Sequence, residues 1–90
     1  MEISFDPAKR EWTLLNRGLD FQEAPIVFEG HTYDWVDARF DYGEERTITV
    51  GRLRGRMVVL VWTKRANARH MISMRKANDR EQAYYAEFLG

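Results

Sequence analysis

The sequence predicts one α+β domain, spanning residues 1–90, in which helices pack against an antiparallel sheet. Three observations support this prediction. Ninety residues suffice for one modest core and leave no room for a second domain. Apolar residues recur at helical spacing over residues 7–29 and again near the C-terminus, whereas residues 46–76 show strand patterns, with alternation over residues 46–52 and a continuous apolar run over residues 57–62. Helices and strands segregated along the chain in this way indicate an α+β fold, here in the order β-α-α-β-β-β-(β)-α, with the two N-terminal helices on one face of the sheet.

The first residues predict a short strand that leads into a helix. Apolar residues alternate over residues 1–5, which suits an opening strand. Asp6 can accept hydrogen bonds from free amides, and Pro7 is tolerated at the first helical position because its missing N–H has no partner there. The helix is expected to run from Pro7 to about Arg17 and to stop at Gly18. Its buried stripe is expected to comprise Ala8, Trp12, Leu14 and Leu15.

A second helix is expected to begin at Asp20. Glu23 follows three residues later, which is the spacing of a capping box. Pro25 lies too deep for the first turn of such a helix and removes one backbone hydrogen bond. The helix is therefore expected to be short or bent, and Gly30 ends it.

Three or four strands are expected after residue 30. Weak alternation at residues 31–37, with Tyr33 and Trp35, suggests an edge strand, and a polar loop follows at residues 37–45. Residues 46–52 alternate clearly. Apolar residues of both parities fill the next strand, so it is expected to be central and covered on both faces. These last strands are residues 56–63 and a segment starting at Arg69, with turns at residues 53–55 and around Asn67.

The segment RHMISMRKANDREQAYY, residues 69–85, joins the last strand to a helix. Regular alternation places Arg69 and Arg75 together on an open face. His70 then points to the opposite face, unless a strand bulge reverses the alternation. Arginines are therefore expected to gather close to the point where the last helix begins.

The last helix is expected to begin after Asn78. Glu81 stands three residues later, which completes a capping-box pattern. Tyr84 and Tyr85 each have an apolar partner four residues on, so one of these two tyrosines is expected to be core.

Composition excludes several classes of protein. The chain has no cysteine, so it has no disulfide framework and no thiolate metal site, and its two histidines are far apart in sequence. No metal and no cofactor are expected. The longest apolar run, residues 57–62, is far shorter than the roughly 20 residues of a membrane helix, and the N-terminus lacks the form of a signal peptide. A cytoplasmic protein without membrane contact is expected.

Charge is divided between the two halves of the chain although the total is zero. Residues 1–45 carry 11 acidic and 4 basic side chains, and residues 46–90 carry 3 acidic and 10 basic ones. No acidic residue lies between Arg46 and Lys76. A surface of one sign favours a polyanion or an acidic protein partner. The alternative is a solvated basic sheet face that the acidic half of the same chain neutralises.

Four motifs together carry a resemblance to a known family. FDPAK, GLDFQEA, GEERTITVG and HMISMRKAN occur in an order and spacing that resemble those of the BrnT toxins of BrnT–BrnA toxin–antitoxin modules. The resemblance implies a RelE-like fold and a metal-independent ribonuclease that acts as a bacteriostatic toxin. It also implies a BrnA-like antitoxin as partner, which binds DNA through a ribbon-helix-helix domain. The toxin is then expected to contact DNA only indirectly, through that partner.

The resemblance extends to individual positions. Lys9 matches the lysine of the opening motif, Arg46 matches the arginine of the GEER strand, and Arg75 with Lys76 matches the basic pair after the serine. One position departs from the pattern: many members have Lys-His before the glycine that ends the first helix, where this chain has Asn16 followed by arginine. A proton-transfer role for a histidine at that point is therefore excluded.

Cleavage of RNA by its own 2′-hydroxyl requires a base, donors to the phosphate and an acid for the leaving oxygen. Arg75 is the first candidate for the phosphate and Arg46 the second, because a guanidinium matches phosphate oxygens two at a time. His70 can exchange a proton at neutral pH, the alternative being a packed histidine. Glu45 is a rival base, or else a solvated loop residue. Tyr85 is included as a candidate that can contact a base or the phosphate.

The remaining candidates are binding residues. Contacts to the RNA backbone are expected from five cations, namely Lys9, Lys64, Arg65, Arg69 and Lys76, with plain solubilising charge as the alternative. Trp35 and Tyr33 are expected in an antitoxin-binding surface, whereas Trp12 and Trp62 are expected in the core. A second hypothesis remains beside the endoribonuclease: a non-catalytic nucleic-acid- or protein-binding module that uses the same basic face.

Overall fold

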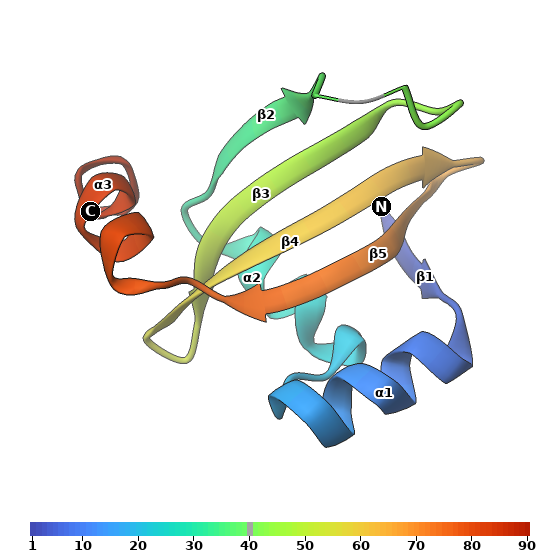
Figure 1. Ribbon diagram of the computed structural model, residues 1–90, viewed down its shortest axis with the longest axis horizontal. Coiled ribbons are helices and arrows are strands. Elements are labelled where there is room, and N and C mark those ends of the chain that lie inside the picture. Colours follow the sequence, from blue (N-terminus) through green and yellow to red (C-terminus); the bar gives the residue numbers. More distant parts are fainter. Residues whose placement is uncertain (40) are drawn as a thin grey trace.

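Five strands form one mixed sheet in the order β1-β5-β4-β3-β2 (Figure 1). The computed structural model describes residues 1–39 and 41–90. Its elements are β1 (Glu2–Phe5), α1 (Pro7–Arg17), a 3-10 turn η1 (Phe21–Glu23), α2 (Ala24–Glu29), β2 (Tyr33–Asp37), β3 (Arg46–Leu53), β4 (Arg56–Arg65), β5 (Ala68–Lys76) and α3 (Asp79–Leu89). Within these described residues, no helix has the length and apolar character needed to cross a membrane.

The predicted α+β class is confirmed, but the prediction of a purely antiparallel sheet was wrong. β2, β3, β4 and β5 pair antiparallel in succession, and β4 is central as expected. β1 instead pairs parallel with β5, Glu2 lying opposite Ala68 and Phe5 opposite Met71. The two strands are separated by most of the chain, so no hairpin forces them to run in opposite directions.

The second helix is short, as expected, but the prediction that it begins at Asp20 and loses a hydrogen bond at Pro25 was wrong. The Asp20 carboxylate accepts a hydrogen bond from the Gln22 amide at 2.9 Å and starts the 3-10 turn η1. A new helix, α2, then begins at Ala24. Pro25 therefore falls within the first turn of α2, where its missing N–H costs no hydrogen bond.

The predicted turns lie where the composition placed them. Arg54 and Gly55 join β3 to β4, and Ala66 and Asn67 join β4 to β5. In the predicted polar loop of residues 37–45, Phe40 lies outside the described residues.

Apolar side chains cover both faces of the sheet. One cluster joins η1 and α2 to the face of β4 that bears Val58 and Leu60, and we call this the α2 face. The other cluster joins Leu89 of α3 to the face that bears Met57 and Val59, which we call the α3 face. Figure 1 shows α3 at one end of the strands, so the rest of the α3 face extends beyond this helix.

The predicted packing of α1 was wrong. Its expected apolar stripe faces solvent, with Trp12 53% and Leu15 77% exposed, and its buried residue is Thr13. α1 lies beside β5, and the Arg17 guanidinium donates to the Met74 carbonyl oxygen at 3.0 Å. β1 pairs with only the first part of β5, so α1 packs against the remaining edge of β5. A helix that packs against a strand edge buries fewer side chains than a helix that packs on a sheet face.

Candidate functional site

A bulge in β5 decides which side chains share the α3 face. Val61 lies opposite Ser73, but its neighbour Trp62 lies opposite Met71, so Ile72 is an extra residue. An extra residue reverses the alternation of every side chain that precedes it on the strand. The alternation expected for Arg69, His70 and Arg75 is therefore broken within β5.

The bulge moves His70 to the α3 face and Arg69 to the α2 face. Thr63 of β4 lies opposite His70 of β5 on one side and opposite Arg46 of β3 on the other. Arg75 of β5 lies opposite Val59 of β4. Directly opposed residues share a face, so Arg46, His70 and Arg75 lie together. The prediction that Arg69 shares a face with Arg75 was wrong, and the bulge that the sequence left open as an alternative is the reason.

Arg46 and Arg75 share this face but do not stand next to each other. Their partners on β4, Thr63 and Val59, are four residues apart, which is about 13 Å along the strand. The two arginines also lie on strands on either side of β4, about 10 Å apart. Their backbone positions are therefore well separated on this face.

The α3 face contains a groove of about 510 Å³ next to α3. Its floor is apolar and comes from the central strands, with Ile48, Val59 and Val61. Cationic side chains from three separate parts of the chain line it, namely Arg17 at the end of α1, Arg39 after β2 and Arg75 on β5. Trp35, Ser73 and Glu81 complete the lining. We call this cavity the arginine groove.

Arg75 forms a two-pronged ion pair with Glu81 in the first turn of α3. The Nη1 and Nη2 atoms donate to Oε1 and Oε2, each at 2.7 Å. Glu81 Oε1 also accepts from the Asn78 amide at 2.9 Å, and Asn78 caps α3 as predicted. The hydrogen bond to Arg75 lowers the pKa of Glu81 to about 2, and the same bond raises the pKa of Arg75. Both groups are therefore charged at neutral pH.

The other two arginines of the groove have partners of their own. Arg17 donates to the Met74 carbonyl oxygen and lies over the Trp12 ring, 5.1 Å from its centroid. Arg39 holds both carboxylate oxygens of Asp37, at 2.9 and 3.0 Å. These hydrogen bonds keep the pKa of Asp37 well below its ordinary value and raise that of Arg39. Their guanidiniums are thus held in place at the rim of the groove.

Tyr85 is the packed tyrosine of α3, and Tyr84 is 61% exposed. Tyr85 stacks on Trp35 with ring centroids 5.5 Å apart and also contacts Tyr33 at 5.8 Å. Burial raises the pKa of Tyr85. The two aromatic residues expected in an antitoxin surface, Tyr33 and Trp35, are therefore half-buried beneath Tyr85 and Phe88 of α3.

His70 lies at the end of the α3 face that is farther from α3. Its Nδ1 atom and the Ser4 hydroxyl are 2.9 Å apart and share a hydrogen bond. Burial lowers the pKa of His70, and Arg65 lowers it further. Arg65 in turn pairs with Glu44 at 3.4 Å. His70 is consequently neutral at neutral pH and is held by a strand neighbour.

Arg46 lies at the same end as His70 and has close neighbours of its own. Its guanidinium lies 3.9 Å from the centroid of the Tyr42 ring, and its Nε is 3.8 Å from Glu44. Among the described residues, this buried Nε has no hydrogen-bond partner. Arg46 is therefore positioned mainly by packing and charge.

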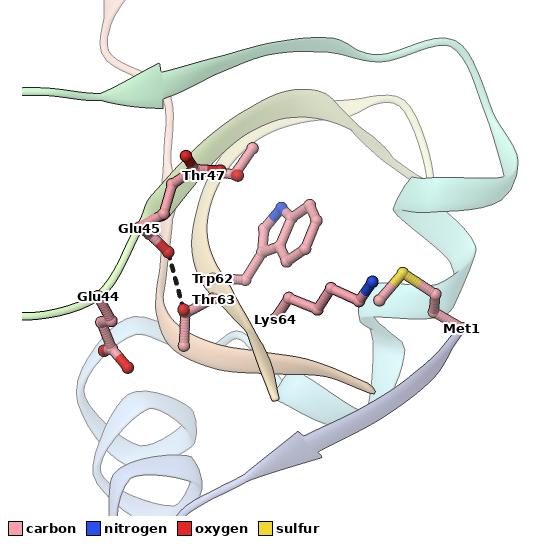
Figure 2. Close-up of a pocket in the computed structure, with 7 residues that line it drawn as sticks. All are labelled: Met1, Glu44, Glu45, Thr47, Trp62, Thr63 and Lys64. Carbon is pink, nitrogen blue, oxygen red and sulfur yellow. Dashed lines mark hydrogen bonds between the residues drawn. The ribbon is translucent and has the colours of Figure 1, made fainter. Parts of the chain in front are cut away.

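Glu45 and Lys64 line a different and smaller hollow of about 260 Å³, shown in Figure 2. It lies where β3 begins and β4 ends, and the Trp62 ring forms one wall. The Glu45 carbonyl oxygen accepts a hydrogen bond from the Thr63 hydroxyl at 2.8 Å. Glu45 is exposed and lies outside the arginine groove.

The remaining cations are spread over several surfaces. Arg69 lies over the rings of Phe28 and Trp62, 4.0 and 5.1 Å from their centroids, on the α2 face. Lys76 is exposed and also belongs to the α2 face, opposite Val58. Lys9 lines a separate cavity of about 250 Å³. Arg17 lines both this cavity and the arginine groove. The cations expected to bind RNA therefore do not form one continuous surface.

Sequence reasoning missed three residues of the groove. Glu81 was read only as a helix cap, although its position six residues after Arg75 spans the strand–helix junction. Arg17 was noted only as a departure from a family pattern. Arg39 carried no signal in the sequence, because its place in the groove depends on the pairing of β2 with β3 and on its ion pair with Asp37.

The protein is thus an α+β domain with an arginine-lined groove on one face of its sheet. Comparison with protein families identifies the chain more closely. Residues 5–81 match the family described as "Ribonuclease toxin, BrnT, of type II toxin-antitoxin system". The chain therefore belongs to the BrnT toxin family, and an antitoxin partner follows from that description. A comparison with curated proteins finds no match.

Proposed function

We propose that this protein is a metal-independent endoribonuclease that holds single-stranded RNA in the arginine groove. The supporting observation is that guanidiniums from α1, the loop after β2 and β5 meet at one cavity with an apolar floor. Phosphates bind to the guanidiniums, and a base can lie on the apolar floor and Trp35. The 2′-hydroxyl attacks the adjacent phosphate, and Arg75 stabilises the charge that develops on it.

The other candidate residues take places along the path of the RNA. Arg46 and His70 lie about 13 Å farther along the same face, where they contact a neighbouring nucleotide. Lys9 and Arg65 flank that path. Glu45 lies in a separate hollow and is a less favourable base than a carboxylate inside the groove. Tyr85 lies close to Arg75 and contributes a hydroxyl to the edge of the site.

The fold and the partner are proposed on the same basis. The four successive antiparallel strands, with helices before and after them, support the RelE-like architecture that the resemblance implies. We propose a BrnA-like ribbon-helix-helix protein as the antitoxin. β2, which carries Tyr33 and Trp35, is an edge strand of the sheet, and an added strand of the partner can pair with it.

The test uses purified protein, labelled single-stranded RNA and a chelator. Cleavage is expected with and without the chelator. Arg75→Ala is expected to lower kcat by about 10²–10³-fold, because it removes donors to the transition-state phosphate. Arg80→Ala is the matched control, since Arg80 is exposed on α3. Circular dichroism shows whether both variants fold.

Two outcomes would contradict the proposal. Cleavage that stops with chelator and returns with Mg²⁺ would show that the groove does not act without metal. Equal activity of Arg75→Ala and Arg80→Ala would show that Arg75 does not contact the reacting phosphate. The alternative function is a non-catalytic binding module that uses the same groove. RNA binding without any cleavage by the wild type would support that alternative.

A further inference from the structure

Glu81 occupies a position in the arginine groove that a helix cap does not require. Among the described residues, it is the one carboxylate that lines the groove. Its side chain is 22% exposed, and both of its oxygens are held toward Arg75 at 2.7 Å. A carboxylate fixed against the phosphate-binding arginine is placed beside the atoms that react.

We infer that Glu81 is the general base that takes the proton from the 2′-hydroxyl of the RNA, an inference that rests on the proposed ribonuclease function. The ion pair uses two of the five N–H donors of Arg75. Donors on the other sides of the guanidinium remain for a phosphate oxygen. A phosphate bound there brings the neighbouring 2′-oxygen within reach of Glu81.

The reaction balances with these groups and water. Glu81 accepts the proton of the 2′-hydroxyl while the bond between O2′ and phosphorus forms. The bond between phosphorus and O5′ breaks, and O5′ takes a proton from water. The products are a 2′,3′-cyclic phosphate and a 5′-hydroxyl, and Glu81 returns its proton to solvent. Arg75 balances the charge on the phosphate throughout.

The other candidate bases are placed less well. His70 lies about 13 Å from Arg75 along the sheet, and its Nδ1 is engaged with Ser4. Glu45 lines the separate hollow of Figure 2. Neither group can reach a 2′-hydroxyl whose phosphate is bound to Arg75.

The environment of Glu81 predicts how the reaction depends on pH. The hydrogen bond from Arg75 holds the pKa of Glu81 at about 2 in the free protein, so the carboxylate is ionised at neutral pH. A bound phosphate shares the charge of Arg75 and thereby raises the pKa of Glu81. The value of kcat/KM reports the free enzyme and kcat reports the complex. The acidic limb of kcat should therefore lie at higher pH than that of kcat/KM.

The experiment compares Glu81→Gln with Glu87→Gln in the cleavage of single-stranded RNA. Glutamine keeps the capping-box geometry of α3 but removes the charged base and, with it, the ion pair with Arg75. Glu87 is exposed on the same helix, so its variant makes the same change of charge elsewhere. Glu81→Gln is expected to lower kcat by about 10²–10⁴-fold, with KM changed by less than about 3-fold. Its acidic limb in kcat should disappear, and Glu81→Asp should recover part of the rate.

Each outcome separates this inference from the proposed function. Cleavage by Glu81→Gln within about 10-fold of wild type, or faster than wild type, overturns the assignment of the base while the ribonuclease function stands. A loss of rate that follows a loss of folded protein in circular dichroism, with an unchanged acidic limb in the remaining activity, also overturns it. No cleavage by the wild type overturns the proposed function, and the assignment of Glu81 with it.

Discussion

At Gly51 of β3, the Val27 side chain of α2 lies close to the backbone of the sheet, and replacing this glycine tests the packing of the α2 face. A Cβ atom at Gly51 would lie 2.6 Å from Cγ1 of Val27 and 3.2 Å from Cγ2 of Thr32. Val27 is fully buried, so its methyl group cannot turn away. Overpacking of this kind costs about 1–3 kcal/mol. Alanine also restricts the unfolded chain, which returns about 0.4–1 kcal/mol.

Gly51→Ala is therefore expected to lower the free energy of unfolding by about 1–2 kcal/mol. Urea denaturation measures this change, and the melting temperature should fall by about 4–8 °C for each kcal/mol. Val27→Ala supplies the matched background, because it removes the methyl group that clashes. In that background Gly51→Ala should be neutral or stabilising, which gives a coupling energy of about 1–2 kcal/mol. An equal cost in both backgrounds would refute the clash.

Three further predictions concern α3 and the ionisable groups. Asn78→Ala removes the cap of α3 and should cost about 1 kcal/mol in urea denaturation, with less helical circular dichroism. Glu81 has a pKa of about 2, below its ordinary 4.5, so its pair with Arg75 stabilises the protein above pH 4.5 and that contribution is lost as pH falls toward 2. Glu81→Gln should remove about 1–2 kcal/mol of this acid dependence, after allowance for the exposure of Arg75. The pKa of His70 is lowered from 6.5 by burial, so stability should fall as pH decreases below about 6.5, and less so in His70→Gln.

Each of these predictions has a contradicting result. An unchanged unfolding midpoint for Asn78→Ala would show that the cap contributes nothing. If the stability of Glu81→Gln and of wild type depends on pH with equal slope, the ion pair with Arg75 does not lower the pKa of Glu81 in the folded protein relative to the unfolded chain. If His70→Gln keeps the full loss of stability below pH 6.5, other groups cause that loss.

Local signals predicted most of the secondary structure. Asp6 with Pro7 and Gly18 placed both ends of α1, because capping and left-handed backbone are properties of neighbouring residues. Asn78 with Glu81 placed the start of α3 in the same way. These features need no information about distant parts of the chain.

The same local reasoning gave a wrong prediction for the packing of α1, because that packing depends on long-range contacts. The apolar spacing of Trp12 and Leu15 is a helical stripe, but spacing does not say whether the stripe meets a sheet face or solvent. In the fold, α1 meets an edge of β5, so the polar Thr13 is buried and both apolar residues remain exposed.

The candidate site likewise combines residues that the sequence predicted with residues that only the folded structure brings together. Arg75 was predicted from its motif, and Arg46 lies on the same face of the sheet. The partner of Arg75, however, follows from the turn between β5 and α3, which brings Glu81 back over the strand. The groove also includes Arg17 and Arg39, which are distant from Arg75 in the chain and meet it only in the folded protein.

The amino-acid sequence by itself determined the α+β class, both ends of α1, the start of α3, the basic character of the second half and membership in the BrnT family. The tertiary structure alone decided which face each charge occupies, because one extra residue at Ile72 reverses the alternation of β5. It also decided that Glu81 meets Arg75. Strand pairing and helix docking depend on contacts between residues far apart in the chain, and no local pattern records those contacts.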